Sequence, residues 1–463
     1  MKKTIKIIFA VLMTFMVFPV MAQTLPEDFE AYLSGIKKNE TEIITEAKVS
    51  FSFPIALKYG TVNVKPKSNI TFYENGNLKS FMTDETIELA ESYGTIVISS
   101  ALDTYRNEVP IVLYEDGSIK SACVPTLSSK EVKTKDQVSL PCGKYSIVPQ
   151  SRISFHPDGS LETFKVSNGS TILFDGQTIQ LVLSTITLHE NGNIKEFTPK
   201  NSMTINGIAS YAKKPVAFYD DGKIQSFYPA KDQGIKIGNV ICAFVSGEPI
   251  EYYHDGIFKS YCIDITGKDV EIFGIKLYCA TPKAILNDED SNADEATRPH
   301  KIQIVYHENG VLQSIRTLQS SAVVMDFPPS FMRIKEIKLY DNSSIESIQF
   351  DPSVLLGAVD DRKFYAWKFI FNKNNINVAR VGILQKGSGR QFTDKSGSCI
   401  LLYSEDGQTV TDIITDNDMD GGITADTDVI LDDNGKPVSY TVKASYGITY
   451  TEEDKKIITK PIK

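Results

Sequence analysis

Short segments of alternating apolar and polar residues recur along this chain, and pairs of them flank an Asn-Gly or Asp-Gly dipeptide. The stretch Ile70–Phe81, which reads I-T-F-Y-E-N-G-N-L-K-S-F, is typical. Alternation with a period of two favours a β-strand that is buried on one face. Asn-Gly between two such segments favours a tight hairpin in which both turn residues adopt positive φ. The pattern therefore predicts a β-hairpin with Asn75 and Gly76 in its turn.

The hairpin pattern is repeated along most of the chain. A degenerate copy covers Ile337–Ile348, with Asn342-Ser343 in the turn, and two late copies contain Gly407 and Gly435. Self-similarity of this kind indicates an array in which each unit packs on the next. Further short segments between the hairpins suggest roughly four strands per unit. The intact copies have their turn glycines at Gly76, Gly117, Gly159, Gly192, Gly222, Gly256 and Gly310.

The predicted fold is all-β. Strands this short pair mainly with their neighbours in sequence, which gives antiparallel pairing. A single hairpin is only marginally stable in water, so the repeats must stack on one another. We therefore expect an elongated array of antiparallel β-hairpin repeats, either a β-solenoid or an open twisted sheet, because unequal unit lengths disfavour a closed propeller.

Two segments interrupt the rhythm. Asn287–His300 is acidic and has no apolar period, which indicates an exposed insertion. Residues 352–398 include the aromatic stretch Phe364–Phe371 and form either a cap or a functional insertion. The predicted organisation is a signal peptide, an N-terminal segment, the hairpin array, this interruption or cap, and C-terminal β repeats, over residues 1–22, 23–48, 49–351, 352–398 and 399–463.

The hairpins resemble a known repeat. Phe72–Ser80 (F-Y-E-N-G-N-L-K-S), Leu188–Glu196 and Val305–Ser314 look like the first half of a MORN-type repeat, in its bacterial antitoxin-like variety. The likeness covers about a dozen residues per unit, and any Asn-Gly hairpin shares much of it. The second half of the family repeat, with its closely spaced glycines, is absent. The resemblance implies stacked antiparallel hairpins and a role in binding or scaffolding, without carrying over an antitoxin role.

The N-terminus predicts export. Residues 1–22 begin with three lysines, continue through the apolar stretch Ile7–Val17 and end in the small residue Ala22. This is the pattern of a cleaved secretory signal peptide. No later segment is long and apolar enough to span a bilayer as a helix. We therefore expect no transmembrane helix after signal removal, and a location in the periplasm, on the cell surface or in the medium.

The net charge restricts the class of partner. The formal charge is −9, and loss of the three lysines of the signal segment takes it to −12. An acidic chain without basic clusters argues against nucleic acid and against anionic membrane surfaces. Calcium or a basic partner remains compatible with this charge.

Six cysteines offer two matched pairs. Cys123 and Cys262 each lie six residues after a turn glycine, and each is followed by another cysteine, Cys142 and Cys279. In an exported chain these pairs could form disulfides, Cys123–Cys142 and Cys262–Cys279, or could be small residues on the buried face. Cys242 and Cys399 have no partner at a matching repeat position.

One segment suggests a metal site. Asp416, Asp418 and Asp420 alternate before Gly421-Gly422, as in the first half of a calcium loop, where the carbonyl of Gly422 would be a further ligand. The twelfth position, which should be an acid, is Thr427. The alternative is a solvated acidic turn without an ion. A metal site built from histidines is less favoured, because three of the five lie at a repeated hairpin-flanking position that is elsewhere Tyr: His156, His189 and His307.

No catalytic motif is present, since the chain lacks G-x-S-x-G, H-E-x-x-H, a phosphate loop and a dinucleotide fingerprint. The leading hypothesis is an exported repeat scaffold that binds a protein or a glycan at the cell envelope. One alternative is an envelope carbohydrate hydrolase supported by the array, because a carboxylate pair leaves no sequence signature. The other is an outer-membrane β-barrel, which export and alternation fit but which the short strands and the K-P-I-K ending disfavour.

Overall fold

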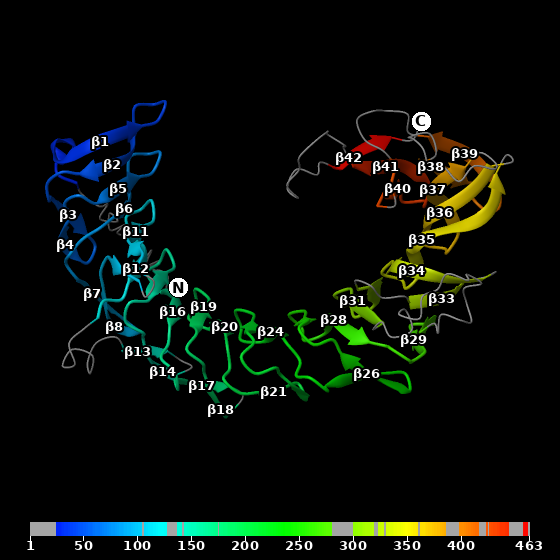
Figure 1. Ribbon diagram of the computed structural model, residues 1–463, viewed down its shortest axis with the longest axis horizontal. Helices are drawn as coiled ribbons and strands as arrows, with labels where there is room; N and C mark the ends of the chain where they lie inside the picture. Colours follow the sequence, from blue (N-terminus) through cyan, green and yellow to red (C-terminus); the bar gives the residue numbers. More distant parts are fainter. Residues whose placement is uncertain are drawn as a thin grey trace, which may run out of the picture. The chain divides into compact units, whose positions relative to one another are not determined.

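The computed structural model describes residues 25–103, 106–126, 137–140, 143–174, 176–279, 300–318, 323–327, 330–359, 362–385, 398–415, 423–424, 426–443 and 457–461. The all-β prediction is confirmed: strands dominate the described residues, and their one helical element is the short 3-10 turn η1 (Phe29–Tyr32) (Figure 1). The predicted signal segment lies outside the described residues. Contacts divide the chain into unit 1, Met1–Asn201 with Asp220–Gly222, and unit 2, Ser202–Tyr219 with Lys223–Lys463.

Unit 1 contains a ladder of antiparallel hairpins. Each strand of the ladder pairs with the strands before and after it, and no described pairing within the unit joins the last strand back to the first. The ladder is therefore open. In order it consists of β1 (Leu33–Lys38), β2 (Ile44–Val49), β5 (Asn69–Phe72), β6 (Leu78–Phe81), β11 (Ile111–Leu113), β12 (Ile119–Cys123), β15 (Arg152–Phe155), β16 (Leu161–Lys165), β19 (Thr185–Leu188) and β20 (Ile194–Phe197).

A second, smaller hairpin follows most ladder hairpins, so that one repeat contains four strands, as predicted. Successive small hairpins touch, because β8 contacts β13 and β14 contacts β17. The small hairpins of unit 1 are β3 (Pro54–Leu57) with β4 (Gly60–Asn63), β7 (Ile87–Glu91) with β8 (Gly94–Ile98), β13 (Gln137–Leu140) with β14 (Gly143–Ser146), and β17 (Thr171–Phe174) with β18 (Gln177–Gln180), beside the minimal pair β9 (Ala101–Leu102) and β10 (Glu108–Val109).

The core of unit 1 lies where the small hairpins pack on the ladder. Tyr145 of β14 meets Phe164 of β16 edge to face, with ring centroids 5.9 Å apart. Both rings are fully buried. Fully burying one large apolar side chain contributes about 1.5–3 kcal/mol, so stability depends on each small hairpin covering its part of the ladder.

Unit 2 repeats this architecture and then changes it. Its ladder strands lengthen as far as β35, which runs from Ile345 to Val359, and shorten again after it. The described pairings again leave the ladder open. In order it consists of β23 (Val216–Phe218), β24 (Ile224–Phe227), β27 (Ile250–Tyr252), β28 (Phe258–Asp264), β31 (Lys301–Tyr306), β32 (Leu312–Thr317), β34 (Ser330–Leu339), β35 (Ile345–Val359), β36 (Arg362–Phe371), β37 (Asn377–Gln385), β38 (Ser398–Tyr403) and β39 (Val410–Thr415).

The small hairpins of unit 2 merge with its ladder. Strand β26 pairs with β28, and β33 pairs with both β30 and β34. The elements are β21 (Thr204–Ile205) with β22 (Ile208–Ala209), β25 (Gly234–Ile237) with β26 (Val240–Phe244), β29 (Val270–Ile272) with β30 (Ile275–Cys279), and β33 (Val323–Phe327).

The segment predicted as an interruption, residues 352–398, continues the ladder in its described part. Strand β35 crosses the expected boundary at 351/352, and β36 and β37 pair after it. The chain then forms a separate three-stranded sheet of β40 (Val429–Leu431), β41 (Pro437–Lys443) and β42 (Ile457–Pro461). This sheet packs on the ladder, because Val429 and Tyr440 share a buried cluster with ladder residues such as Ile370 and Ile400.

The hairpin turns differ from the prediction. Gly76 has a φ of 86°, but Asn75 is not among the described residues with positive φ. The Gly76 N–H donates to the Tyr73 carbonyl at 2.9 Å, and the Tyr73 N–H donates to the Asn77 carbonyl at 2.8 Å. These bonds define a three-residue loop, a type I turn that ends in a glycine bulge. The expectation that both residues adopt positive φ was therefore wrong, because the loop is one residue longer than a two-residue turn.

The repeated Tyr or His before each turn connects successive hairpins. The hydroxyl of Tyr73 donates to the Leu113 carbonyl at 2.7 Å, and Leu113 directly precedes the equivalent residue of the next hairpin, Tyr114. His takes the same role, since His156 Nε2 lies 3.2 Å from the Leu188 carbonyl. The other bonds of this column are Tyr114 to Phe155, Tyr219 to Tyr252, Tyr253 to Tyr306, His307 to Leu339 and Tyr340 to Phe371.

The column ends where Asn replaces the ring. Asn372 stands at the position of Tyr340 in the next turn, and its Oδ1 accepts the N–H groups of Asn374 and Ile376 at 3.0 and 3.1 Å. Asn39, before the first ladder turn, accepts those of Thr41 and Ile43 in the same way. At this position of the turn, the Asn side chain bonds within its own loop and stabilises that loop. The Tyr and His rings of this column therefore occur between Tyr73 and Tyr340, where each ring bonds to the backbone of the next hairpin.

Replacement of Tyr114 tests the column. Tyr114→Phe keeps the ring beneath Lys120, whose ammonium lies 5.3 Å from the ring centroid, but it removes the hydroxyl. We expect the free energy of unfolding in urea, followed by circular dichroism, to fall by about 1 kcal/mol. Tyr114→His should lose less, because His occupies this position elsewhere in the column. The control is Tyr211→Phe, at an exposed tyrosine outside the column. Equal losses in Tyr114→Phe and Tyr211→Phe would contradict the role of the bond.

Candidate binding cleft

Two cavities in unit 2 share one carboxylate. The first measures about 620 Å³ and lies among three turns: those of β34–β35, β36–β37 and β40–β41. The second measures about 430 Å³ and lies over β31, β32 and β34. Glu346, at the start of β35, lines both cavities. We refer to the two together as the polar cleft.

Self-capped turns hold the walls of the first cavity. Asp432 Oδ1 accepts the N–H groups of Asn434 and Lys436, both at 2.9 Å, as Asn372 does in the facing turn. The two turns approach closely, since a Cβ on Gly435 would lie 2.8 Å from the Cβ of Asn372. Gly435 also has a φ of 78°, so glycine is required on both counts. The rim of the cavity is therefore fixed by backbone geometry.

The floor of the first cavity is aliphatic. Ile370 and Val429 are buried in the cluster beneath it, while Ile430 exposes 41% of its surface. The rim is polar and carries Glu346, Asp433 and Asn374, with further polar groups around them. The cavity thus combines an apolar surface with hydrogen-bonding groups at its edge.

An ion pair attaches the C-terminal sheet to the ladder. The ammonium of Lys368 on β36 contacts the carboxylate of Asp428, and the Lys368 side chain is only 4% exposed. Asp426 lies beside the same strands and accepts from Gln349 Nε2 at 3.4 Å, with Lys335 Nζ at 3.5 Å. Removing Asp428, whose side chain is 52% exposed, would leave the buried Lys368 ammonium uncompensated, which is costly. These contacts fix the position of the cleft wall that β40 provides.

Glu346 is the most perturbed acid of the cleft. Burial raises the pKa of its carboxyl above the usual range, and the neighbouring Asp428 raises it further, while Lys338 and Lys368 oppose the shift. No hydrogen bond to its carboxyl group occurs within the described part of the chain. Glu346 therefore has hydrogen-bonding capacity that a bound molecule could use.

The second cavity lies on a cross-strand row of polar residues. Gln303, Arg316 and Glu336 are opposite one another on β31, β32 and β34. Arg316 donates to one Glu336 oxygen from Nε at 3.1 Å and from Nη2 at 2.7 Å. Lys338 lines the same cavity. The second cavity therefore offers donors where the first offers mainly acceptors.

The predicted calcium ligands Asp416, Asp418, Asp420 and Gly422 lie outside the described residues, and the site stays a prediction. Downstream, the Thr427 hydroxyl accepts the Thr424 N–H at 2.9 Å.

The predicted disulfides also stay predictions. Cys123 and Cys262 are free, buried thiols here, Cys142 lies outside the described residues, and Cys279 is described only as the end of β30. Burial raises the pKa of the Cys262 thiol to about 12, so this thiol is unreactive.

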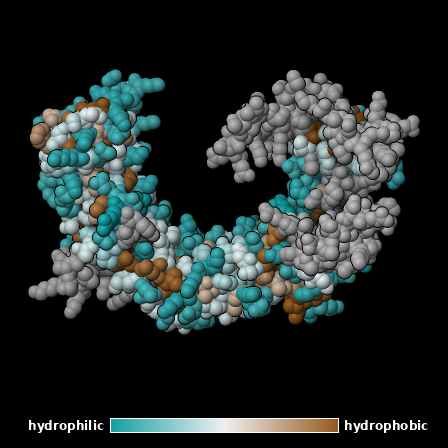
Figure 2. Space-filling model, in the orientation of Figure 1, coloured by the Kyte–Doolittle hydropathy of each residue, from teal (hydrophilic) through white to brown (hydrophobic). Residues whose placement is uncertain are grey.

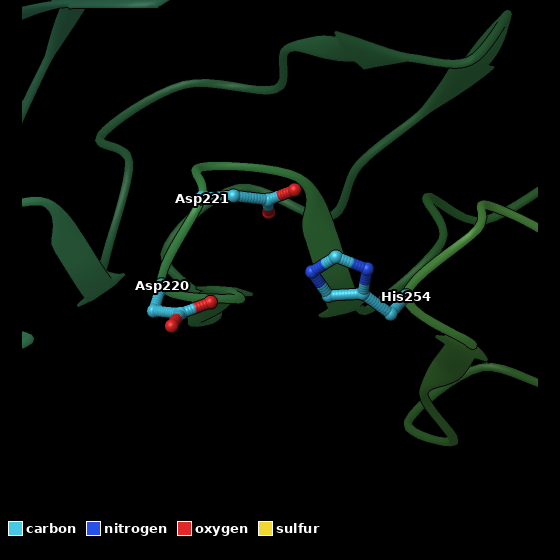
Figure 3. Close-up of side chains that lie close together, drawn as sticks. All are labelled: Asp220, Asp221 and His254. Carbon is cyan, nitrogen blue, oxygen red and sulfur yellow. The ribbon is translucent and has the colours of Figure 1, made fainter.

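One group of potential metal ligands occurs among the described residues. Asp220, Asp221 and His254 offer ligand atoms that all lie within 4.8 Å of one another (Figure 3). All three side chains are exposed, and exposed acidic groups are common without an ion. The His254 ring also packs edge to face on Tyr219, at 5.1 Å between centroids. This packing explains His254 without a metal, as the ring column explains His156 and His307.

The exposed apolar residues do not form one strip. The face seen in Figure 2 is largely hydrophilic, with separate hydrophobic patches. The most exposed large apolar side chains, at 53–68% of their surface, belong to different hairpins and loops: Phe51, Leu173, Leu183, Ile241 and Phe273. No helix within the described ranges is long and apolar enough to cross a membrane.

Comparisons with known proteins identify no relative. No protein family and no curated protein matches the chain. Among solved structures it is similar to a chain of "Crystal Structure of TcdB2-TccC3-Cdc42" at 9% identity and a TM-score of 0.09, covering 88% of this chain and 26% of that one. A chain of the "Structure of Photorhabdus luminescens Tc holotoxin pore" matches at 9% identity and a TM-score of 0.11, with 87% and 21% covered. The chain thus spans about a quarter of their length, and scores this low carry no argument.

The pKa of Tyr340 gives a pH-dependent prediction. Burial raises it from the ordinary 10.0 to about 12, and the neutral hydroxyl donates to the Phe371 carbonyl at 2.9 Å. The folded state therefore favours the neutral phenol, and this stability is complete below pH 10 and lost as the pH rises through about 12. The stability difference between the natural protein and Tyr340→Phe should be constant from neutral pH to pH 10 and then shrink. A constant difference up to the alkaline limit would contradict this.

Proposed function

We propose that the chain is an exported repeat scaffold that binds a protein or a glycan at the cell envelope. The observation that carries the proposal is the polar cleft, where a stack of hairpins and a separate C-terminal sheet form a rigid, polar recess. Repeat arrays commonly present such surfaces for recognition. The signal-like segment 1–22 supports export, and the MORN-like hairpins support a binding role. No basic cluster or catalytic motif favours another class.

A second candidate is a carbohydrate hydrolase that acts in the same cleft. The specific observation is the pair Glu346 and Asp428: burial raises the pKa of the first, and Lys368 compensates the charge of the second. Two carboxylates in unlike environments are what acid-assisted glycoside cleavage requires, one as proton donor and one as an ionised partner. The scaffold remains the first choice because it also accounts for the repeat array, an architecture that commonly presents recognition surfaces.

We also propose calcium as a structural ligand of the loop from Asp416 to Gly422. Three alternate carboxylates and a following carbonyl are suitable oxygen ligands for this ion. The loop directly precedes Ile423, which packs in the cluster beneath the cleft. Bound calcium would therefore support the C-terminal sheet rather than chemistry.

A capture experiment tests the scaffold. Mature protein, residues 23–463, is immobilised and exposed to separated envelope protein and envelope glycan fractions, in calcium and in chelator. We expect one fraction to be retained through a high-salt wash, and retention to fall in chelator if the loop binds calcium. Heat-unfolded protein on the same support is the control. Retention of neither fraction, or equal retention by the unfolded control, would contradict the scaffold.

Turnover assays separate the two candidates. Mature protein is incubated with envelope polysaccharide, and new reducing ends are counted. The scaffold predicts no release above background from either the natural protein or Glu346→Gln. Release that Glu346→Gln lowers by about 100-fold or more would establish the hydrolase instead, because loss of a general acid has effects of this size.

A further inference from the structure

We infer that the polar cleft binds an oligosaccharide without carboxylate groups, and that Glu346 contacts it where the two cavities meet. This inference rests on the proposed binding function and specifies its ligand. It concerns described residues of unit 2 alone.

The lining of the first cavity matches the chemistry of a sugar ring. A pyranose has an apolar C–H face and a perimeter of hydroxyl groups. The apolar residues that line the cavity offer a surface for that face: Ile370, Val429, Ile430 and Leu431. Around it, carboxylates and amides can accept from or donate to adjacent hydroxyl groups. Asp433, Asn374 and Glu346 form part of this rim.

The size of the recess indicates more than one sugar unit. Volumes of about 620 and 430 Å³ each lie within the range of small-ligand sites. Because Glu346 lines both, a chain bound across them would pass this side chain. In the second cavity, Gln303, Ser314 and Lys338 provide hydrogen-bonding groups for the next unit.

The charges decide which saccharide fits. The first cavity is lined by the carboxylates of Glu346, Asp428, Asp432 and Asp433. Lys373, 5.8 Å from the centroid of the Tyr340 ring, is the one cation among the described residues that line this cavity, and the nearby Lys368 pairs with Asp428. A uronate would meet like charge in a partly buried site, which is unfavourable. Neutral sugars and amino sugars avoid this repulsion.

A peptide fits the cleft less well. Peptides that bind sheets commonly add a strand to a free edge, which requires unpaired backbone groups. The ladder strands that line the cleft, β34, β35 and β36, each have pairing partners on both sides. The ladder wall of the cleft therefore exposes side chains rather than backbone, which suits a hydroxylated ligand, whereas β40 on the opposite wall pairs, within the described ranges, with β41 alone.

Calorimetric titration of the full mature chain tests the inference with four probes: cellotetraose, cellobiose, the glucosamine tetramer and tetragalacturonate. We expect the neutral and amino tetramers to bind, cellobiose to bind several-fold more weakly than cellotetraose, and tetragalacturonate not to bind. Glu346→Ala should weaken cellotetraose binding about tenfold or more, as expected for loss of a hydrogen bond to a charged group. The matched control is Glu271→Ala, at an exposed glutamate of the same unit outside the cleft.

Two safeguards keep the outcome decisive. If Glu346→Ala does not fold, as judged by circular dichroism, Asn374→Ala on the exposed rim replaces it, and a several-fold loss is expected. Preferred binding of tetragalacturonate, unchanged affinity in the cleft variants, or no binding of any probe by folded protein would overturn the inference. If an envelope protein is nevertheless retained in the capture experiment, the scaffold function stands and only the saccharide cleft is lost.

Discussion

The hydrogen bond from one hairpin's ring to the next hairpin's backbone is the interaction on which the array depends. An isolated two-stranded hairpin is marginal in water, so each unit must gain stability from its neighbour. Strand pairing supplies part of this, but it does not hold the turns, which extend into solvent. Tyr73 and its equivalents connect each turn to the following strand end, at a carbonyl that would otherwise have a free lone pair. Because the phenol and the imidazole both donate at this reach, Tyr and His alternate in the column.

The same logic explains where the column stops. After Tyr340 the turns are capped by Asn372, Ser404 and Asp432, which bond within their own loops. Among the described residues, these turns have no ring-to-backbone bond to the next turn. A separate sheet packs against the ladder instead, through Val429, Tyr440 and the pair of Lys368 with Asp428. The polar cleft lies at this change of architecture. The turns that form its rim are fixed by hydrogen bonds within their own loops. Its polarity comes from side chains outside the buried core, such as Glu346, Asn374 and Asp433.

The sequence predicts the repeating fold well and the cleft poorly. Alternation and the turn glycines predict most ladder hairpins, but not β1–β2 or β36–β37, whose turns contain no glycine. The repeated Tyr or His is predicted as a hairpin-flanking position. The acceptor of that ring was not readable, because it lies 31 to 53 residues away across segments of varying length. The cleft has no motif, since Glu346, Asn374 and Asp433 are brought together only by the pairing of long strands. The segment that looked like an interruption after residue 351 is where these long strands begin, and its aromatic stretch forms part of β36.

Hydrogen exchange measures the central claim most directly, because it reports the opening of individual hairpins. In the Tyr114→Phe variant, amide exchange should accelerate in β11, β12, β15 and β16, the two hairpins that this ring connects, and should remain unchanged in the ladder of unit 2. That result is expected if stability passes from each hairpin to its neighbour. Unchanged exchange in these four strands, or a uniform acceleration throughout the chain, would contradict the account.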